Sequence, residues 1–168
     1  MIFAIVLFFA NNVGAQKKIN WLTWNQMVAK QKVENKKVIV DLYTDWCGWC
    51  KKMDKTTFAN PVIVDYINKN YYAVKFNAEQ KEDINFDGQV YKFVGSGRRG
   101  YHELAAALSQ NRLSYPTYVF LTKDMKLLQV IPGYQQADDF EYIINYFGGD
   151  YYKNTPWAKF EKEFTPKL

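Results

Sequence analysis

The chain has 168 residues, of which 48% are hydrophobic and 18% aromatic, a composition that predicts a globular domain with its own core and excludes a disordered chain. The net charge is +5, but the 22 basic residues are dispersed, and a nucleic-acid interface needs a clustered basic stripe. Two cysteines and one histidine are too few for a structural zinc site, which takes about four ligands. We therefore expect no nucleic-acid partner, no metal and no other cofactor.

Residues 1–15 carry no charged side chain and have the pattern of a secretory signal peptide, an apolar run followed by small residues. Val13-Gly14-Ala15 fits the small-residue pattern before a cleavage point, so we expect a cut before Gln16 and a single exported domain over 16–168, periplasmic or secreted. The apolar run is too short to span a bilayer, which disfavours stable membrane insertion after cleavage. The missing positive n-region leaves an atypical signal or an upstream start open.

Helix and strand signals alternate over the first half of the domain. Thr23 to Gln26 has the pattern of a capping box that opens a helix, and Asn60-Pro61 interrupts a later helical stretch. The expected elements, in chain order, are a helix over 23–34, an apolar central strand over 37–43, a helix from Cys47 to about 55, a second helical piece from 62, and a strand over 71–77.

The second half begins with an irregular segment, 78–114, in which we expect two short helices around 90–94 and 101–110. The expected elements after it are a strand over 117–121, a hairpin partner over 127–131, a closing helix over 138–147, and a C-terminal extension over 150–168. The order of elements predicts an α/β fold, with a mixed central sheet flanked by helices on both faces.

Cys47 and Cys50 are the only cysteines, and they lie at a predicted strand-to-helix turn. Unpaired backbone N–H groups and the helix dipole at such a turn favour a thiolate, which is the form that attacks disulfides. A cross-link over two intervening residues contributes little stability, because the entropic benefit grows with loop length. The pair is therefore poorly explained as a structural cross-link and predicts thiol–disulfide chemistry.

The chain resembles the thioredoxin family, and four landmarks in the family's order carry the resemblance. They are the strand with its CGWC motif over 40–51, the strand Val74-Lys75-Phe76-Asn77, the turn Tyr115-Pro116-Thr117, and Pro132-Gly133 after the hairpin. The resemblance implies a thioredoxin-like fold in which 78–114 is a helical insertion before the strand that follows a cis-proline.

The resemblance also implies catalytic roles for four residues. Cys47 matches the exposed nucleophile and Cys50 the resolving thiol, while Asp41 matches a buried carboxylate that moves protons to and from Cys50. Lys75 matches the partner of that carboxylate, and a desolvated Asp of this kind has a raised pKa suited to a general base near neutral pH. A purely structural Asp41–Lys75 ion pair is the plain alternative, and it is compatible with catalysis.

Substrate contacts are expected around the sulfurs. Pro116 matches the cis-proline that faces them, and the backbone beside it at Tyr115 would align an extended substrate strand. Trp46, Gly48 and Trp49 would contact substrate or shield the sulfurs, with Trp49 expected to be exposed; packing is the alternative for both tryptophans. An ordinary trans Pro116 is the alternative to the cis form.

We expect a monomeric thiol–disulfide oxidoreductase that acts on cysteine-containing exported proteins and is recycled by a separate redox partner protein. Asp45–Lys52 and Thr57–Pro61 resemble small secreted thioredoxin-like proteins and domains of periplasmic disulfide reductases, which favours that branch over cytosolic thioredoxin. We expect reductase or isomerase activity in preference to oxidase activity. Gly48-Trp49 replaces the common Gly-Pro and tunes the reduction potential, so the direction of electron flow stays open. The alternative is a thioredoxin-fold binding or chaperone module without redox turnover.

A competing signal lies in the expected insertion. Residues 95–100 read G-x-G-x-x-G, the fingerprint of a dinucleotide-binding loop, if residues 90–94 formed the preceding strand. The chain is too short for two mononucleotide-binding halves beside the cysteine unit, so we interpret the motif as a solvated loop. His102 is expected to be a surface helix residue, with a position near the active site as the alternative.

Overall fold

The computed structural model describes residues 17–96 and 99–168. The expected signal peptide, 1–15, and Gly97-Arg98 of the glycine-rich motif lie outside the described residues.

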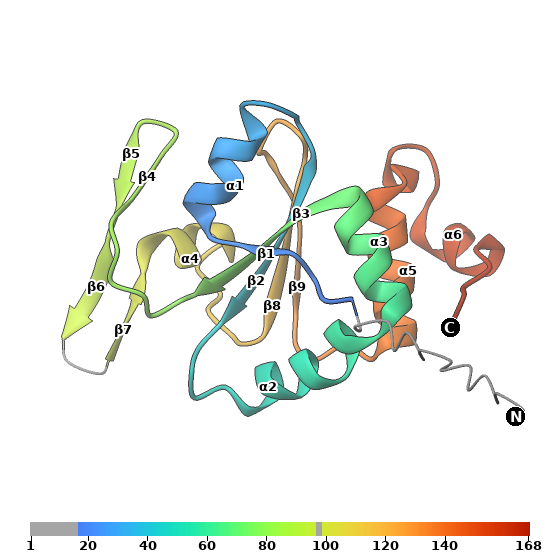
Figure 1. The fold of residues 1–168 in the computed structure, drawn as a ribbon, viewed down its shortest axis with the longest axis horizontal. Helices are drawn as coiled ribbons and strands as arrows, with labels where there is room; N and C mark the ends of the chain where they lie inside the picture. The colour runs from blue at the N-terminus through green and yellow to red at the C-terminus, as the bar shows by residue number, and fades with distance from the viewer. Residues whose placement is uncertain (1–16, 97–98) are drawn as a thin grey trace, which may run out of the picture.

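A five-stranded mixed sheet forms the centre of the structure (Figure 1). Its strands, from one edge to the other, are β1 (Trp21–Leu22), β3 (Tyr71–Asn77), β2 (Lys37–Tyr43), β8 (Thr117–Leu121) and β9 (Leu127–Pro132). The first three are parallel, while β8 is antiparallel to both of its neighbours. β2 lies in the middle with its first six residues buried, which explains its largely apolar sequence, because both faces of the strand are covered.

Helices cover both faces of this sheet (Figure 1). α1 (Trp24–Gln31) and α4 (Glu103–Leu108) lie on one face, and α3 (Pro61–Asn70) and α5 (Ala137–Gly148) on the other. Alternate residues of β2 divide between the two resulting cores, with Val38, Val40 and Leu42 on the α1 side and Ile39 on the α3 side. The predicted fold class is confirmed.

Helix α1 begins as predicted and ends earlier than expected. The Thr23 hydroxyl accepts the Gln26 N–H, and the Gln26 side chain accepts the Thr23 N–H, which completes the capping box. The helix ends at Gln31, whose side-chain amide bonds both backbone groups of Lys36. Val33 is almost fully exposed, so no apolar surface is buried by continuing the helix to 34.

The insertion is mostly β-structure, so the prediction of a helical insertion is wrong. Two hairpins, β4 (Ile84–Phe86) with β5 (Gln89–Tyr91) and β6 (Phe93–Ser96) with β7 (Arg99–His102), replace the helix expected over 90–94. Asp87 and Gly88 between β4 and β5 have positive φ angles of 51° and 75°, the conformation that Asp-Gly supplies to two-residue hairpins. Of the second expected helix, 101–110, only α4 forms.

The described residues of the glycine-rich motif, 95–96 and 99–100, lie in the paired strands β6 and β7, so they lack the strand-then-helix order of a dinucleotide loop. Gly95 lies opposite Gly100 across the β6–β7 ladder. A Cβ atom at Gly100 would lie 2.3 Å from the Phe93 ring and 2.5 Å from the Val94 carbonyl oxygen. Close approach of the two strands therefore explains Gly100 without a phosphate ligand.

His102 is buried, so its prediction as a surface residue is wrong. Its Nδ1 accepts the Leu104 N–H at 3.2 Å and its Nε2 lies 2.9 Å from the Glu82 carbonyl oxygen. The ring packs edge-on against Phe76 at 5.4 Å. The ring nitrogens cap α4 and connect two parts of the insertion, while the ring contact with Phe76 ties the insertion to β3.

The C-terminal extension packs against α5, as expected for its aromatic residues. It contains the 3-10 turn η2 (Tyr151–Lys153) and the helix α6 (Trp157–Glu163), whose Phe160 is buried against Tyr142 and Tyr146. The buried Glu141 carboxylate of α5 accepts the backbone N–H groups of Lys167 and Leu168 at 2.8–3.1 Å.

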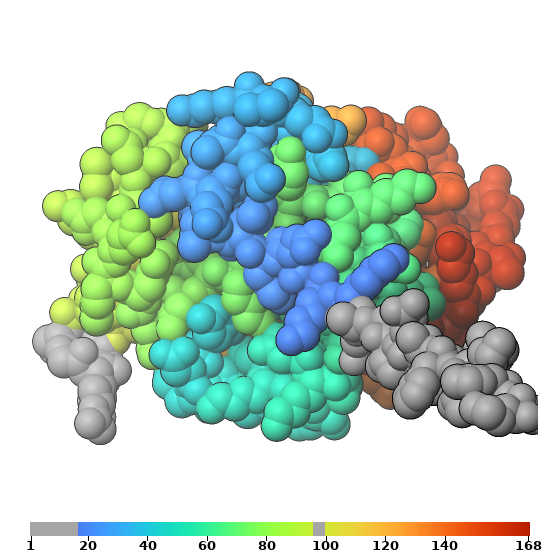
Figure 2. Space-filling model, in the orientation of Figure 1, coloured from blue at the N-terminus to red at the C-terminus, as the bar shows by residue number. Residues whose placement is uncertain are grey.

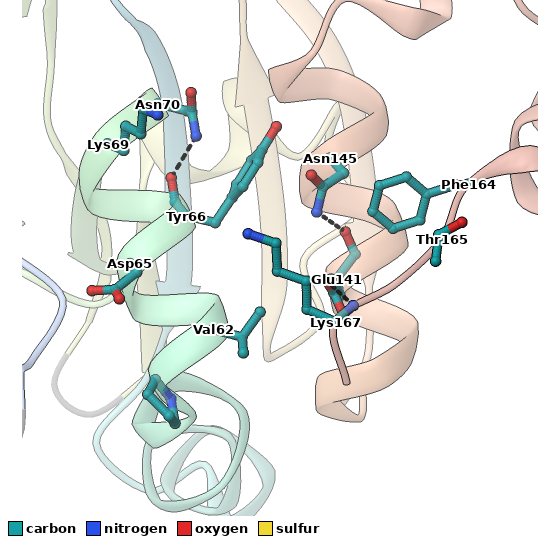
Figure 3. Close-up of a pocket in the computed structure, with 11 residues that line it drawn as sticks. Val62, Asp65, Tyr66, Lys69, Asn70, Glu141, Asn145, Phe164, Thr165 and Lys167 are labelled. Carbon is teal, nitrogen blue, oxygen red and sulfur yellow. Dashed lines mark hydrogen bonds between the residues drawn. The ribbon is translucent and has the colours of Figure 1, made fainter.

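A pocket of about 490 Å³ lies between α3, α5 and this tail, and the Lys167 side chain reaches into it (Figure 3). The hairpins and the tail form opposite ends of the molecule, with the helix that follows the cysteines between them (Figure 2). In the described part of the chain, no helix has the length and apolar character needed to cross a bilayer.

Candidate active site

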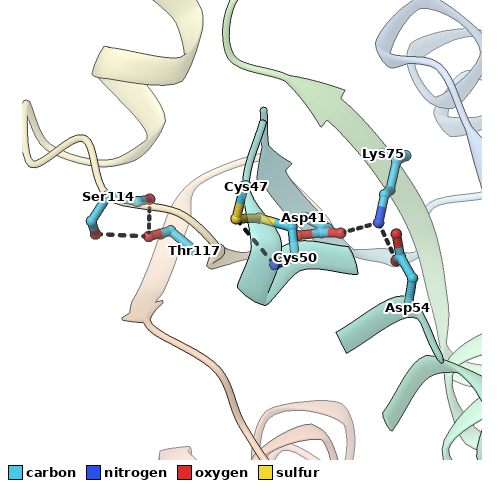
Figure 4. Close-up of a disulfide and its surroundings, with 7 residues drawn as sticks. All are labelled: Asp41, Cys47, Cys50, Asp54, Lys75, Ser114 and Thr117. Carbon is cyan, nitrogen blue, oxygen red and sulfur yellow. Dashed lines mark hydrogen bonds and ion pairs between the residues drawn. A yellow bond between two sulfur atoms is a disulfide. The ribbon is translucent and has the colours of Figure 1, made fainter. Parts of the chain in front are cut away.

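The two cysteines lie where the central strand turns into a helix. β2 ends at Tyr43, a short turn follows, and Cys47 is the N-cap of α2 (Gly48–Lys55). The Cys47 N–H donates to the Thr44 carbonyl at 3.1 Å, which closes the turn. The two sulfurs form a disulfide, with the Cα atoms 5.3 Å apart (Figure 4).

The helix N-terminus is directed at the first sulfur. The Cys50 N–H donates to Cys47 Sγ at 3.0 Å, so the sulfur occupies the place of the oxygen acceptor of an ordinary N-cap. A thiolate at this position would receive the same N–H and the positive end of the helix dipole. The local geometry therefore stabilises the reactive form of Cys47 relative to its protonated form once the disulfide is reduced.

Both sulfurs are enclosed, which differs from the exposed Cys47 that the resemblance implies. In the disulfide state Cys47 is 4% exposed and Cys50 is 2% exposed. Trp46 precedes Cys47 in the chain and Trp49 follows it, and both tryptophan side chains are exposed.

Asp41, Lys75 and Asp54 form a charged chain that leads from the sheet interior to the surface (Figure 4). Asp41 of β2 is buried, and its Oδ2 accepts the Lys75 ammonium at 2.6 Å; β3 carries Lys75 directly opposite in the parallel register. Lys75 also pairs with the more exposed Asp54 of α2. The expected Asp41–Lys75 pair is present, and Asp54 extends it.

Burial raises the pKa of Asp41 to about 6, although the Lys75 charge and hydrogen bond lower it. Burial by itself lowers the pKa of Lys75, but the two carboxylates outweigh this effect and the net shift is upward. Among the residues that the structure describes, none bonds the second Asp41 oxygen, Oδ1. A carboxyl group that titrates near neutral pH with one free oxygen can accept and return a proton.

The loop before β8 lies at the end of the sheet where β2 leads into the cysteine turn. Thr117 pairs with Leu42 because β8 runs antiparallel to β2, so β8 begins where β2 ends. The Tyr115–Pro116 peptide bond is cis, as predicted, and the Pro116 carbonyl accepts the Gly133 N–H at 2.8 Å. The Thr117 hydroxyl donates to the Ser114 carbonyl at 2.7 Å and closes the loop (Figure 4).

Two exposed tryptophans border the disulfide, and each contacts a tyrosine near the cis-proline loop. Trp46 is 67% exposed, and its ring centroid lies 6.0 Å from that of Tyr115. Trp49 is 57% exposed, as expected, and lies 5.5 Å from Tyr134. A Cβ added at Gly48, between them, would meet no atom within 4 Å from the described chain beyond its own neighbours and helix backbone, so this side of the motif is open.

The insertion builds a hollow beside Trp46. The Trp46 indole N–H donates to Glu79 Oε1 at 3.0 Å, and Asn77 donates to Asp45 at 3.1 Å. These residues, with Phe93 of β6, line a hollow of about 440 Å³. Within residues 17–96 and 99–168, no three His, Cys, Asp or Glu side chains gather as a metal site would require.

Sequence reasoning missed Asp54, Glu79 and Tyr134. Asp54 lies four residues after Cys50, on the same helix face, so its position was readable from the helical period. Glu79 and Tyr134 reach the site only through the packing of the insertion and of the loop after β9, which no local pattern encodes.

An Asp41→Asn variant should be more stable than the parent at neutral pH. The folded state binds more protons at Asp41 than the unfolded state between its ordinary pKa of 3.8 and about 6, so the wild-type free energy of unfolding falls as pH rises through this window. The expected gain at pH 7.5 is about 2–3 kcal/mol, converging to nearly none at pH 4. Urea unfolding at a series of pH values measures it. The exposed Asp124→Asn variant should keep the wild-type pH slope, and a parallel slope in Asp41→Asn would contradict the assignment.

A Lys75→Met variant should raise the pKa of Asp41 above about 6, because it removes the charge and the hydrogen bond that lower it. We expect an upward shift of at least about one unit. Carbon-13 NMR titration of labelled aspartate carboxyl groups, assigned with Asp41→Asn, measures the shift. Lys51→Met removes an exposed charge on α2 and serves as the matched control. An unchanged or lower Asp41 pKa would show that Lys75 does not act on this carboxylate.

The model of the thioredoxin-like domain matches residues 24–148 of this chain. Among curated proteins, "Uncharacterized protein B0495.5" of Caenorhabditis elegans is 28% identical over 112 residues, which cover 66% of this chain and 13% of that protein. The thiol:disulfide interchange protein DsbD of Pseudoalteromonas atlantica is 37% identical over 49 residues, covering 29% of this chain and 8% of DsbD. The matches span only a small part of these relatives.

Solved structures show the same fold. The DsbH oxidoreductase superposes with a TM-score of 0.57 at 16% identity, covering 88% of this chain and 95% of DsbH. A putative disulphide-isomerase from Bacteroides thetaiotaomicron gives a TM-score of 0.55 at 22% identity, covering 81% and 98% of the two chains. With the domain match over most of its length and a disulfide-forming CxxC pair at the strand-to-helix turn, this chain belongs to the thioredoxin-like family.

Proposed function

We propose that this protein catalyses thiol–disulfide exchange on cysteine-containing exported proteins, as a reductase or isomerase. One observation carries the proposal: the Cys50 N–H is directed at Cys47 Sγ at the N-terminus of α2. This arrangement favours a thiolate nucleophile with a second sulfur already in bonding position. Export is inferred from the signal-like residues 1–15.

The exchange begins with the dithiol form. The Cys47 thiolate attacks one sulfur of a client disulfide, a Cys47–client S–S bond forms, and the client S–S bond breaks. The released client sulfur takes up a proton. Tyr115 and cis-Pro116 border the approach path, and the peptide groups of this loop are proposed to align the client backbone.

Resolution uses the second sulfur. Cys50 loses its proton, for which Asp41 with a pKa of about 6 is the proposed acceptor, and attacks Cys47 Sγ. The Cys47–client bond breaks, the second client sulfur takes up a proton, and the Cys47–Cys50 disulfide re-forms. The client has then gained two electrons and two protons. A dithiol of a separate redox partner protein would restore the reduced form.

Whether the protein reduces or oxidises its clients depends on the reduction potential of the Cys47–Cys50 couple. The short match to DsbD, a thiol:disulfide interchange protein, supports exchange with other proteins and does not fix the direction. The CGWC dipeptide and the surrounding residues set the potential of the couple, because the N–H donors that stabilise a thiolate favour the reduced form.

Cys47→Ser should abolish catalysis of insulin reduction by dithiothreitol, leaving only the uncatalysed rate, because no nucleophile remains at the helix N-terminus. Cys50→Ser should accumulate a covalent Cys47–client adduct, detectable by mass spectrometry, because resolution is lost. A Cys47→Ser variant with the wild-type rate would overturn the proposal. Suppression of client aggregation that is equal in the wild type and the double serine variant would instead support a binding or chaperone module.

Equilibration of the Cys47–Cys50 pair in glutathione buffers tests the direction. We expect a potential nearer to ~−270 mV, the value typical of a thioredoxin reductant, than to ~−120 mV, that of a strong oxidant. Alkylation of free thiols followed by mass spectrometry gives the reduced fraction at each glutathione ratio. A value near the oxidant limit would contradict reductase or isomerase activity while leaving the exchange chemistry intact.

A further inference from the structure

The face of α2 next to the disulfide carries unneutralised positive charge. Lys51, Lys52 and Lys55 are all exposed, and within the described chain none has a carboxylate oxygen within ion-pair distance. The one acidic residue of the helix, Asp54, is paired with Lys75. The ammonium groups of this face are therefore available to a partner.

Lys52 is fixed at this surface by two aromatic rings. Its Nζ lies 4.8 Å from the ring centroid of Trp49 and 4.8 Å from that of Tyr134, and the two rings are 5.5 Å apart. The Tyr134 hydroxyl lies 3.1 Å from the Thr56 hydroxyl, within hydrogen-bond distance. Trp49, Lys52 and Tyr134, here called the Trp49 platform, thus form one preorganised unit of apolar surface and positive charge.

The Trp49 platform borders the path of an incoming sulfur. Trp49 lies between the two cysteines in the sequence, and Tyr134 follows Gly133, whose N–H binds the cis-Pro116 carbonyl at 2.8 Å. A polypeptide that reaches Cys47 beside the cis-proline loop passes this surface. Its residues next to the reacting cysteine are the ones that come within range of Lys52.

The two tryptophans differ in the sign of their charged neighbours. Trp46 donates its indole N–H to Glu79 and follows Asp45 in the turn, and the hollow beside it is lined by these two carboxylates and one ammonium group, that of Lys81. Trp49 instead packs against Lys52. An acidic client side chain is therefore favoured on the Trp49 side over the Trp46 side. Charge complementarity therefore favours an acidic client side chain at the Trp49 platform.

We propose that the Trp49 platform is a docking site for polypeptides that carry an acidic side chain next to their reactive cysteine. This inference rests on the proposed exchange function and names its preferred client class. The carboxylate pairs with Lys52, and the adjacent apolar atoms of the client cover the Trp49 and Tyr134 rings. The contact acts before the S–S bond is attacked, so it changes the rate of association more than the exchange chemistry.

The expected effect is modest because Lys52 is exposed. Exposed charge pairs contribute little, so we expect an acidic client to react about threefold faster than a neutral one and a basic client to react more slowly. The difference should nearly vanish at high salt, since the screening length falls from about 20–30 Å near 0.01–0.02 M to about 3–5 Å near 0.5–1 M.

The test uses the full chain, reduced with dithiothreitol and desalted, mixed with disulfide-linked peptide dimers in single-turnover reactions. Three peptides place Glu, Gln or Lys on both sides of the cysteine. Acid quenching, alkylation and mass spectrometry give each rate, normalised to the rate with 2-mercaptoethanol to remove intrinsic peptide reactivity. Each series is run at about 0.02 M and about 0.5 M salt.

Lys52→Glu should reverse the order, so that the Lys peptide becomes the fastest. Lys69→Glu makes the same charge change at the C-terminal end of α3, where β3 starts. This is the opposite end of the strands from the cysteines, so the variant should keep the wild-type order. If Lys52→Glu does not fold, Lys52→Gln and the salt dependence of the wild type carry the same test.

Equal normalised rates for the three peptides with the wild type at low salt would overturn the docking site while leaving the exchange function in place. The same holds if Lys69→Glu reverses the order as strongly as Lys52→Glu, since the effect would then be one of net charge. If no peptide disulfide is reduced faster than by 2-mercaptoethanol, the exchange function itself fails.

Discussion

The backbone N–H of Cys50 meets the sulfur of Cys47 at 3.0 Å, and the chemistry of this site depends on that contact. It exists because the central strand β2, buried over its first six residues, leads through a short turn into α2, which places Cys47 at the N-cap of that helix. The antiparallel strand β8 begins where β2 ends, so the cis-proline loop that precedes β8 lies at the same end of the sheet as the cysteines. Sheet topology and helix N-terminus together make the site.

The buried carboxylate shows where function conflicts with stability. Asp41 occupies a position in β2 where an apolar side chain would be more stable, and Lys75 offsets only part of the cost of burial. The residual upward pKa shift makes the group a useful proton acceptor near neutral pH. Asp54 connects the pair to the surface, so the charge is buried at one end and solvated at the other.

The side chains around the disulfide determine which client polypeptides can reach it. Little of either cysteine is exposed, while the rings of Trp46 and Trp49, which pair with Tyr115 and Tyr134, are exposed. The insertion forms one side of the hollow beside Trp46, and it consists of hairpins where a helix was expected. Two-residue turns such as Asp87-Gly88 select the hairpin locally, a signal that outweighs the weak helical pattern of 90–94.

The sequence alone determined the fold class and placed the CxxC pair at a strand-to-helix turn, because periodicity and capping are local signals. The cis form of Pro116 and the Asp41–Lys75 pair followed from the resemblance to the thioredoxin family. The tertiary structure decided that Cys47 is enclosed and that His102 is buried. It also brought Glu79 and Tyr134 to the site. These outcomes depend on contacts between segments far apart in the chain, and the side-chain packing that produces them has no local signature.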